Sequence, residues 1–162
     1  MNIEIICIGG LKEPWLRDAE GEYLKRLQPY CKMSVTELRE ERLPVNAGVA
    51  EEESVRVREG KALLSAAEKH GKSSFIYALD MRGRQMTSEK FAERTNALML
   101  DGKSTIVFLI GGSLGLSAAV REKADAMLSF SEMTFPHQLM RVILLEQIYR
   151  SQKIMHGEPY HK

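Results

Sequence analysis

An apolar stretch runs directly into glycine at Ile106-Val-Phe-Leu-Ile-Gly111-Gly112-Ser113-Leu-Gly115. Backbone without side chains at the carboxyl end of a strand is where α/β sheets receive ligands, so this segment predicts a binding pocket. A nucleoside-type cofactor could lie against that backbone, with Phe130, Met133 and Phe135 as apolar walls. Glycine is equally typical of a tight turn without a ligand, so the spacing alone leaves both interpretations open.

The same loop fits the G-x-S-x-G pattern of a serine hydrolase, with Ser113 as the nucleophile. Asp125 and His137 follow in the hydrolase order. Only about a dozen residues separate successive members, which leaves little chain to bring them together from separate strand ends. A hydrolase is therefore the less favoured alternative. A phosphate-binding loop at Asp101-Gly-Lys103-Ser104 fails, because that segment precedes a strand and lacks the leading glycine.

Titratable and basic side chains in the last quarter of the chain could act as bases or bind phosphate. His137 precedes Arg141 by one helical turn, so both could face one pocket. The ending Pro159-Tyr160-His161 joins a stiff turn to one stacking ring and one titratable ring, which suits an unstacked RNA base. Polar chain ends and lone histidines also occur without any function. Arg82 and Arg84 are further basic candidates, and their alternative interpretation is a solvated loop.

The elements that must position these residues alternate along the chain. We expect strands at residues 3–8, 33–38, 74–79, 105–110 and 126–130, and helices at residues 14–27, 49–70, 88–100, 117–124 and 136–155. Residues 80–87 are expected to form a loop. Near-continuous apolar strands between helices predict an α/β fold with a mostly parallel sheet and helices on both faces. The last helix is apolar around much of its circumference, which favours a symmetric dimer interface over burial within one subunit.

Length and composition limit the classes of protein to which the chain can belong. The 162 residues fit one domain, residues 1–162, and 44% hydrophobic and 28% charged residues exclude a disordered or fibrous chain. A net charge of +1 provides no global field for coating DNA or RNA. Strand-sized apolar runs and a start unlike a signal peptide predict a cytoplasmic protein without a membrane segment. Cys7 and Cys31 lack metal-ligand spacing, so no metal site is expected.

Several of these pieces together resemble a known family. They are Leu79-Asp80 before a glycine-containing loop, Phe108-Leu-Ile-Gly111-Gly112, the 130–135 segment, Pro136-His137 with Arg141, and the Pro159-Tyr160-His161 ending. In this order they resemble the bacterial large-subunit ribosomal RNA pseudouridine N3-methyltransferases, of the SPOUT class. The resemblance covers essentially the whole chain, and the ordered combination is far more specific than any single piece.

The resemblance implies a fold, a cofactor and partners. The fold would carry a C-terminal trefoil knot, which no residue pattern could reveal and which is rare among proteins. S-adenosylmethionine would bind in the knot, and no metal would be required. The residues implied around the cofactor are Leu79, Gly111, Phe130, Ser131, Glu132, Met133, Thr134 and Phe135. The protein would be a homodimer, with ribosomal RNA in the assembled 70S ribosome as its substrate.

The implied reaction transfers a methyl group to N3 of a pseudouridine, so a base and a positioning group are needed. The catalytic candidates are His137, Arg141, Tyr160 and His161. His137 or His161 would remove the N3 proton, Tyr160 would hold the base, and Arg141 or Arg150 would bind phosphate or the developing anion. A non-enzymatic ribosome-associated docking factor with the same fold is the main alternative.

Overall fold

The computed structural model describes residues 1–160 as five strands and five helices in strict alternation. In chain order they are β1 (Asn2–Ile8), α1 (Pro14–Leu27), β2 (Lys32–Leu38), α2 (Val49–Glu68), β3 (Ser74–Arg84), α3 (Ser88–Leu100), β4 (Thr105–Ile110), α4 (Ala118–Lys123), β5 (Ala126–Leu128) and α5 (His137–Met155). The strands form one sheet in the order β2-β1-β4-β3-β5, and every pairing is parallel. The expected α/β class and parallel sheet are confirmed. No helix in the described part is long and apolar enough to cross a membrane.

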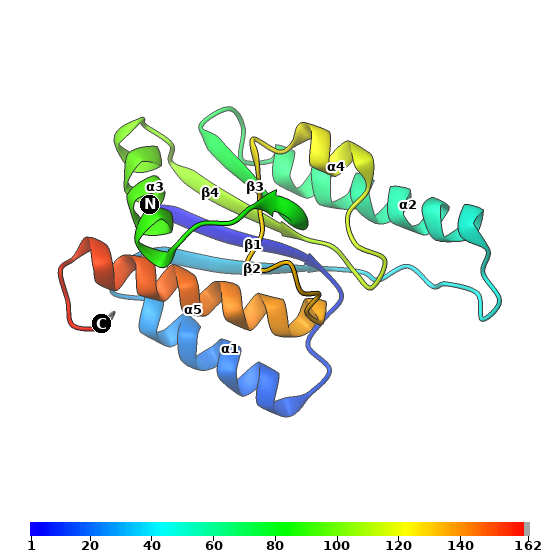
Figure 1. Ribbon diagram of the computed structural model, residues 1–162, viewed down its shortest axis with the longest axis horizontal. Coiled ribbons are helices and arrows are strands. Elements are labelled where there is room, and N and C mark those ends of the chain that lie inside the picture. Colours follow the sequence, from blue (N-terminus) through cyan, green and yellow to red (C-terminus); the bar gives the residue numbers. More distant parts are fainter. Residues whose placement is uncertain (161–162) are drawn as a thin grey trace.

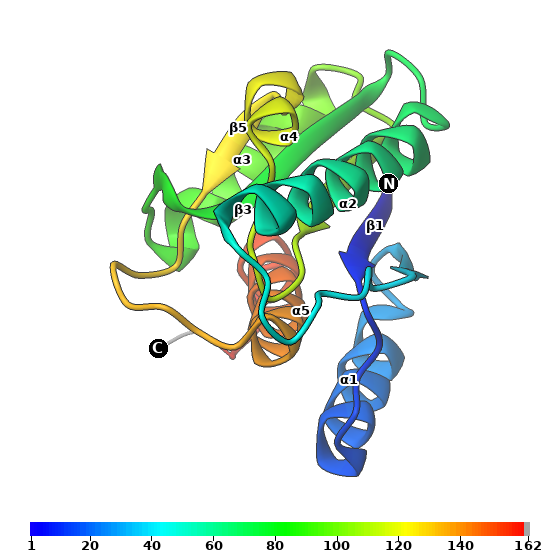
Figure 2. The same ribbon diagram turned by 90° about the vertical axis from the view of Figure 1, so that its right-hand side faces the viewer.

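Helices cover both faces of the sheet (Figure 1). α1, α3 and α5 lie on one face, and α2 and α4 lie on the other (Figure 2). Alternate residues of the central strands supply the two cores: Ile5 and Phe108 pack under α1, α3 and α5, whereas Ile6 and Leu109 pack under α2 and α4. All six residues of β4 are buried, as expected for a strand covered on both sides.

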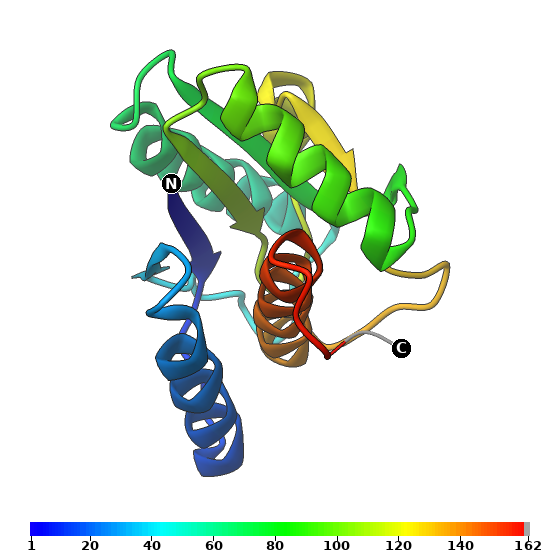
Figure 3. The ribbon, with the colours of Figure 1, turned by 90° about the vertical axis from the view of Figure 1, so that its left-hand side faces the viewer.

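α5 is the middle helix of its face, with α1 on one side and α3 on the other (Figure 3). Leu144, Leu145 and Ile148 are fully buried in the core, and Leu139, Met140 and Ile143 are half-buried. Two helical neighbours and the sheet therefore account for much of the apolar surface of α5. The helix is less exposed than its sequence suggests, and the homodimer remains a prediction.

The third strand is longer than expected. A loop was expected from residue 80, because Gly83 and its charged neighbours are typical of turns, but β3 continues to Arg84. After an irregularity in register, Arg84 pairs with Leu128. A Cβ atom on Gly83 would lie 2.6 Å from the carbonyl carbon of Leu128, so glycine here permits two backbones to approach. This glycine marks a crossing of strands and not a turn.

The other differences are small. β5 ends at Leu128 and not at residue 130, because Ser129 turns its hydroxyl to the carbonyl of Ser131. α2 ends at Glu68, and His70 leaves the helix to contact Glu4, 2.9 Å away. α5 begins one residue after Pro136, which caps it.

Candidate functional site

β4 and β5 end on either side of β3, which continues beyond them to Arg84. β4, β3 and β5 are neighbours in the sheet order, Ala78 pairs with Leu109, and Leu79 pairs with Leu128. Neighbouring strands lie about 4.8 Å apart. Leu79 therefore lies level with the ends of β4 and β5, and Gly111 and Phe130 follow those ends within two residues. The structure brings these three predicted cofactor residues together, at the edge where parallel sheets bind ligands.

The glycine loop after β4 folds tightly on itself. Gly112 and Gly115 form an isolated bridge, and the Gly115 N–H donates to the Gly112 carbonyl at 3.0 Å. A Cβ atom on Gly111 would lie 2.7 Å from the carbonyl carbon of Gly115, and Gly115 itself has a φ of 75°. Both positions require glycine for the shape of the loop. The tight turn that the sequence left open is therefore present, with or without a ligand.

α2 supports this loop from behind through two residues that the sequence did not single out. Arg56 Nε donates to the carbonyl of Leu114 at 3.0 Å. Glu59, which is buried, places its carboxylate against Gly112 and accepts the N–H of Glu41. Burial raises the pKa of Glu59 above its ordinary value, because the charged form loses its water. Both residues sit in a highly charged helix, so the sequence offers no signal that separates them from solvated neighbours.

The segment 130–135 extends from the end of β5 across this edge. Phe130 packs partly against the core, whereas Met133 is 75% exposed. The Met133 N–H donates to Ser131 Oγ at 3.0 Å, so the first half of the segment is a local turn. Glu132 and Thr134 are exposed. The predicted residues of this segment thus form a largely exposed loop that is anchored at Phe130.

His137 begins α5 at the same edge of the sheet. It shares a small hollow of about 10 Å³ with residues from the ends of β1 and β4, among them Cys7 and Ile110. Burial lowers the pKa of His137; Lys12 and Arg141 lower it further, whereas Glu40 raises it. A place at the positive end of a helix acts in the same direction, so the neutral imidazole is favoured. A neutral ring can accept a proton.

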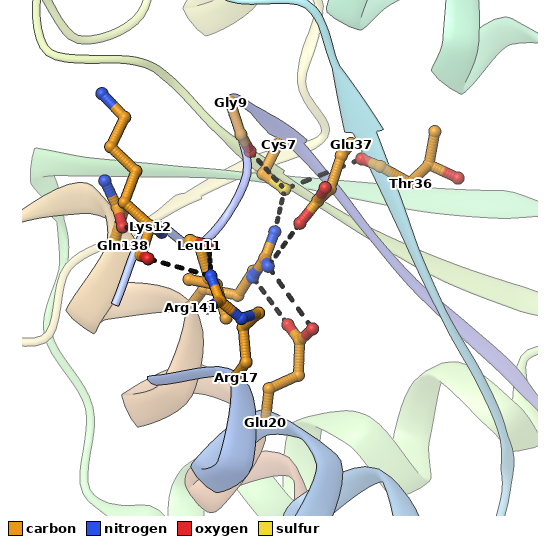
Figure 4. A network of polar contacts seen from close by, with 10 residues as sticks. All are labelled: Cys7, Gly9, Leu11, Lys12, Arg17, Glu20, Thr36, Glu37, Gln138 and Arg141. Atoms are coloured by element: carbon orange, nitrogen blue, oxygen red, sulfur yellow. Dashed lines mark hydrogen bonds and ion pairs between the residues drawn. The ribbon is translucent and has the colours of Figure 1, made fainter. Parts of the chain in front are cut away.

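Arg141 lines the same small hollow as His137, as the sequence predicted, but its side chain does not face open solvent. Its side chain is 2% exposed and lies inside a polar network between α5, α1 and the sheet (Figure 4). Arg141 Nε lies 2.7 Å from Glu20 Oε2, and Nη2 donates to Glu37 Oε1 at 2.6 Å. Nη1 donates to Cys7 Sγ at 2.9 Å. These partners occupy all three guanidinium nitrogens, so contact with an RNA phosphate would require breaking ion pairs.

The start of the tail is docked on α5. The ring of Tyr160 meets that of Tyr149 edge to face with 4.9 Å between centroids, and the guanidinium of Arg150 lies 4.8 Å from the Tyr160 ring centre. Tyr160 Oη donates to Glu146 Oε1 at 3.1 Å. Burial, together with the nearby Glu146 carboxylate, raises the pKa of Tyr160 to about 12. His161 lies outside the described residues.

Within one chain, the tail and the strand ends lie at different levels of α5 (Figure 1). Tyr149, which holds Tyr160, follows His137 by twelve residues. At 1.5 Å per residue this is roughly 18 Å along the helix. The structure therefore brings Leu79, Gly111, Phe130 and His137 to one edge and places Tyr160 elsewhere.

A larger hollow than the one beside His137 lies away from this edge. It has a volume of about 630 Å³ and lies between α1 and the edge strand β2. It is lined by Glu20, Leu24, Gln28, Cys31, Met33, Ser34, Val35 and Glu37. Its polar lining includes two carboxylates, Glu20 and Glu37, and the predicted cofactor residues do not border it. The candidate site is therefore at the strand ends and not in this hollow.

The hydrolase arrangement does not form. No hydrogen bond or ion pair within the described residues joins Ser113 to His137 or Asp125. Asp125 instead accepts the backbone N–H of Ile76 at 2.7 Å. No group of three or more His, Cys, Asp or Glu side chains in this part of the chain is arranged to hold a metal ion.

Comparisons with known proteins agree with this geometry. Residues 1–161 match a family model described as predicted SPOUT methyltransferase. The chain is 51% identical over 163 residues to ribosomal RNA large subunit methyltransferase H of Clostridium botulinum (strain Kyoto / Type A2), and 52% identical over 162 residues to the protein of that name from Clostridium novyi (strain NT). Both matches cover all of both chains.

A solved structure also shares the fold. A probable methylase family protein from Haemophilus influenzae Rd KW20 superposes with a TM-score of 0.55 at 11% sequence identity, covering 99% of this chain and 70% of that one. At this identity the likeness concerns the fold alone. The family match and the full-length relatives show that the chain belongs to the SPOUT methyltransferase family.

Proposed function

We propose that this protein transfers a methyl group from S-adenosylmethionine to N3 of a pseudouridine in large-subunit ribosomal RNA, within the assembled 70S ribosome. The observation that carries the proposal is the meeting of Leu79, Gly111 and Phe130 at one sheet edge, in a chain about half identical to relatives named as methyltransferases of large-subunit ribosomal RNA. We further propose that the protein acts in the cytoplasm.

The residue types at this edge suit a nucleoside-type cofactor. Half-buried Leu79, Phe130 and Phe135 offer apolar surface, and the glycine loop offers backbone groups. A ligand of this size needs a pocket of roughly 300–1,000 Å³. The hollow beside Ile110 and His137, at about 10 Å³, is far too small. The largely exposed 130–135 segment would therefore have to move outward to admit the cofactor and then cover it.

When bound, S-adenosylmethionine supplies a methyl group that is already electrophilic, because its sulfur is positively charged. The protein must then remove the N3 proton and align the attacking nitrogen. We propose His137 as the base, because its environment favours the neutral ring. His161 remains the alternative base.

The remaining catalytic candidates fall into two groups. Tyr160 would hold the target base, and Arg150, which lies over its ring, would meet phosphate or the developing anion. Arg141 is enclosed by Glu20 and Glu37, so its contribution would be to hold α5 in place and not to touch RNA. Among the four catalytic candidates, Arg141 is therefore the least suited to a direct role.

We also propose a homodimer, and the separation of the tail from the strand ends within one chain supports it. If Tyr160 acts on the same nucleotide as His137, the tail of a second copy must reach across, because the tail of the same chain is docked roughly 18 Å along α5. The trefoil knot implied by the resemblance remains a prediction.

The test is binding and turnover with purified protein. S-adenosylhomocysteine, added in a calorimetric titration, should bind once per chain, and ribosomes incubated with tritiated S-adenosylmethionine should gain label at one pseudouridine of the large-subunit RNA. A folded protein that gives a flat titration would overturn the cofactor assignment. Tight ribosome binding without incorporation of label would instead support the docking factor.

A further inference from the structure

The part of β3 beyond Leu79, residues 80–84, forms an arm that has no role in the site described above. Its backbone is fixed at both ends. The Ser129 N–H donates to the carbonyl of Arg84 at 3.1 Å. Asp80 accepts the N–H of Arg82 at 2.9 Å and lies 3.3 Å from Arg121 Nη1. The arm is therefore a braced extension of the sheet, next to the end of β5.

The arm presents two arginines to solvent. Gly83 faces the backbone of Leu128, where a Cβ atom would lie 2.6 Å from its carbonyl carbon. Residues on either side of Gly83 point away from this crossing, because side chains alternate along a strand. Arg82 and Arg84 are both exposed, and two residues of a strand span roughly 6.6 Å.

These two guanidinium groups have no partner among residues 1–160: no hydrogen bond, ion pair or ring contact of either side chain occurs there. Other cations around the same edge are engaged. Lys12 pairs with Glu40, and Arg121 pairs with Asp80. Asp80, the acid nearest in sequence, is thus already neutralised and does not compete for Arg82 and Arg84. The arm keeps a net positive charge beside the 130–135 segment.

We propose that Arg82 and Arg84 bind backbone phosphates of the RNA strand that carries the target nucleotide. Arginine suits this task, because its planar group can donate two parallel hydrogen bonds to one phosphate. Contacts to phosphate position a nucleic acid without reading its sequence. The arm therefore orients the RNA over the strand ends, while the pocket and tail select the base. This inference rests on the proposed function, since the partner is the RNA that is methylated there.

The magnitude follows from counterion release. For single-stranded nucleic acid, the logarithm of the affinity falls with the logarithm of the salt concentration, with a slope of about −0.7 for each phosphate that is neutralised. At 0.1 M salt, one such contact therefore raises the affinity about fivefold, and two raise it about 25-fold. Removing both arginines should therefore raise KM for ribosomes about 25-fold at that salt concentration, with kcat unchanged. The slope of log KM against log salt should fall by about 1.4.

The experiment compares Arg82→Gln/Arg84→Gln with Lys61→Gln/Lys72→Gln. The control variant loses the same two charges from exposed positions, on α2 and before β3. Methyl transfer to ribosomes is measured from 50 to 300 mM KCl, S-adenosylhomocysteine binding by calorimetry, and ribosome binding by sedimentation. The arginine variant should lose ribosome affinity and salt dependence and keep its affinity for S-adenosylhomocysteine, whereas the control should match the unchanged protein.

Equal behaviour of the two variants would overturn the proposal, and so would a fall in kcat at unchanged KM. A loss of S-adenosylhomocysteine affinity equal to the loss of ribosome affinity would also overturn it, because the arginines would then belong to the cofactor pocket. If the unchanged protein transfers no methyl group, the proposed function fails on its own. Sedimentation at each salt concentration still decides whether the arm binds ribosomal RNA.

Discussion

Replacing Arg141 with methionine should destabilise the protein strongly. The guanidinium is 2% exposed and lies within 2.7 Å of carboxylates on α1 and β2. Breaking a buried ion pair by removing one partner costs about 3–5 kcal/mol, because a buried charge is left uncompensated. We expect about 3 kcal/mol, since half-exposed Glu37 can regain water. In a domain of this length that loss lowers Tm by about 6–12 °C.

Urea denaturation followed by circular dichroism measures this loss, with Arg26→Met as the control. Arg26 forms an exposed pair with Glu22 on α1, so its removal should change little. The penalty of Arg141→Met should shrink at acidic pH. Burial already raises the pKa of Glu20, and without Arg141 this carboxyl would take up a proton and no longer carry an unpaired charge. A loss below 1 kcal/mol at pH 7, or one that grows on acidification, would refute the reasoning.

Three further predictions test the site. An NMR titration of His137 should give a midpoint below the ordinary value of 6.5. The stability that the neutral ring contributes is then complete above pH 6.5 and is lost as the pH falls through the midpoint. A midpoint above 6.5 would contradict the lowered pKa. Glu59 has a raised pKa, so the free energy of unfolding should fall as the pH rises above 4.5. In urea denaturations at a series of pH values, Glu59→Gln should reduce this fall. An equal pH dependence in the variant and the unchanged protein would contradict the prediction. Gly111→Ala should weaken S-adenosylhomocysteine binding at least tenfold, because the new methyl group meets the Gly115 backbone at 2.7 Å. Gly21→Ala, at an exposed position of α1, is the control and should not weaken binding. Equal calorimetric affinities of the two variants would contradict the prediction.

Much of the fold could be predicted from local patterns. The alternation of apolar strands with helices predicts the α/β class, and the predicted helix starts at residues 88 and 117 lie within one residue of α3 and α4, which Thr87 and Ser117 cap. Gly83 was interpreted as part of a loop, because a sequence does not show whether glycine serves a turn or a close approach of two backbones.

The site was harder to predict, because its geometry depends on contacts between distant parts of the chain. Arg141 and Glu37 are 104 residues apart, so the sequence does not show their pairing; the hollow that Arg141 shares with His137 was predicted, but the ion pairs that enclose Arg141 were not. The position of Gly111 was easier to foresee, because it directly follows a buried strand and ligands bind at the carboxyl ends of parallel strands; Leu79 was identified only through the family resemblance, since β3 continues beyond it.

The central place of α5 affects how the protein is made. Residues 137–155 are synthesised after every other described helix, yet they fill the gap between α1 and α3. Until they leave the ribosomal exit tunnel, the sheet face that includes Ile5, Tyr77 and Phe108 lacks its middle cover. A nascent chain in this state exposes the kind of apolar surface that chaperones bind and that promotes aggregation. A shortened product ending before α5 would therefore be a target for proteases, even with its sheet-forming sequence intact.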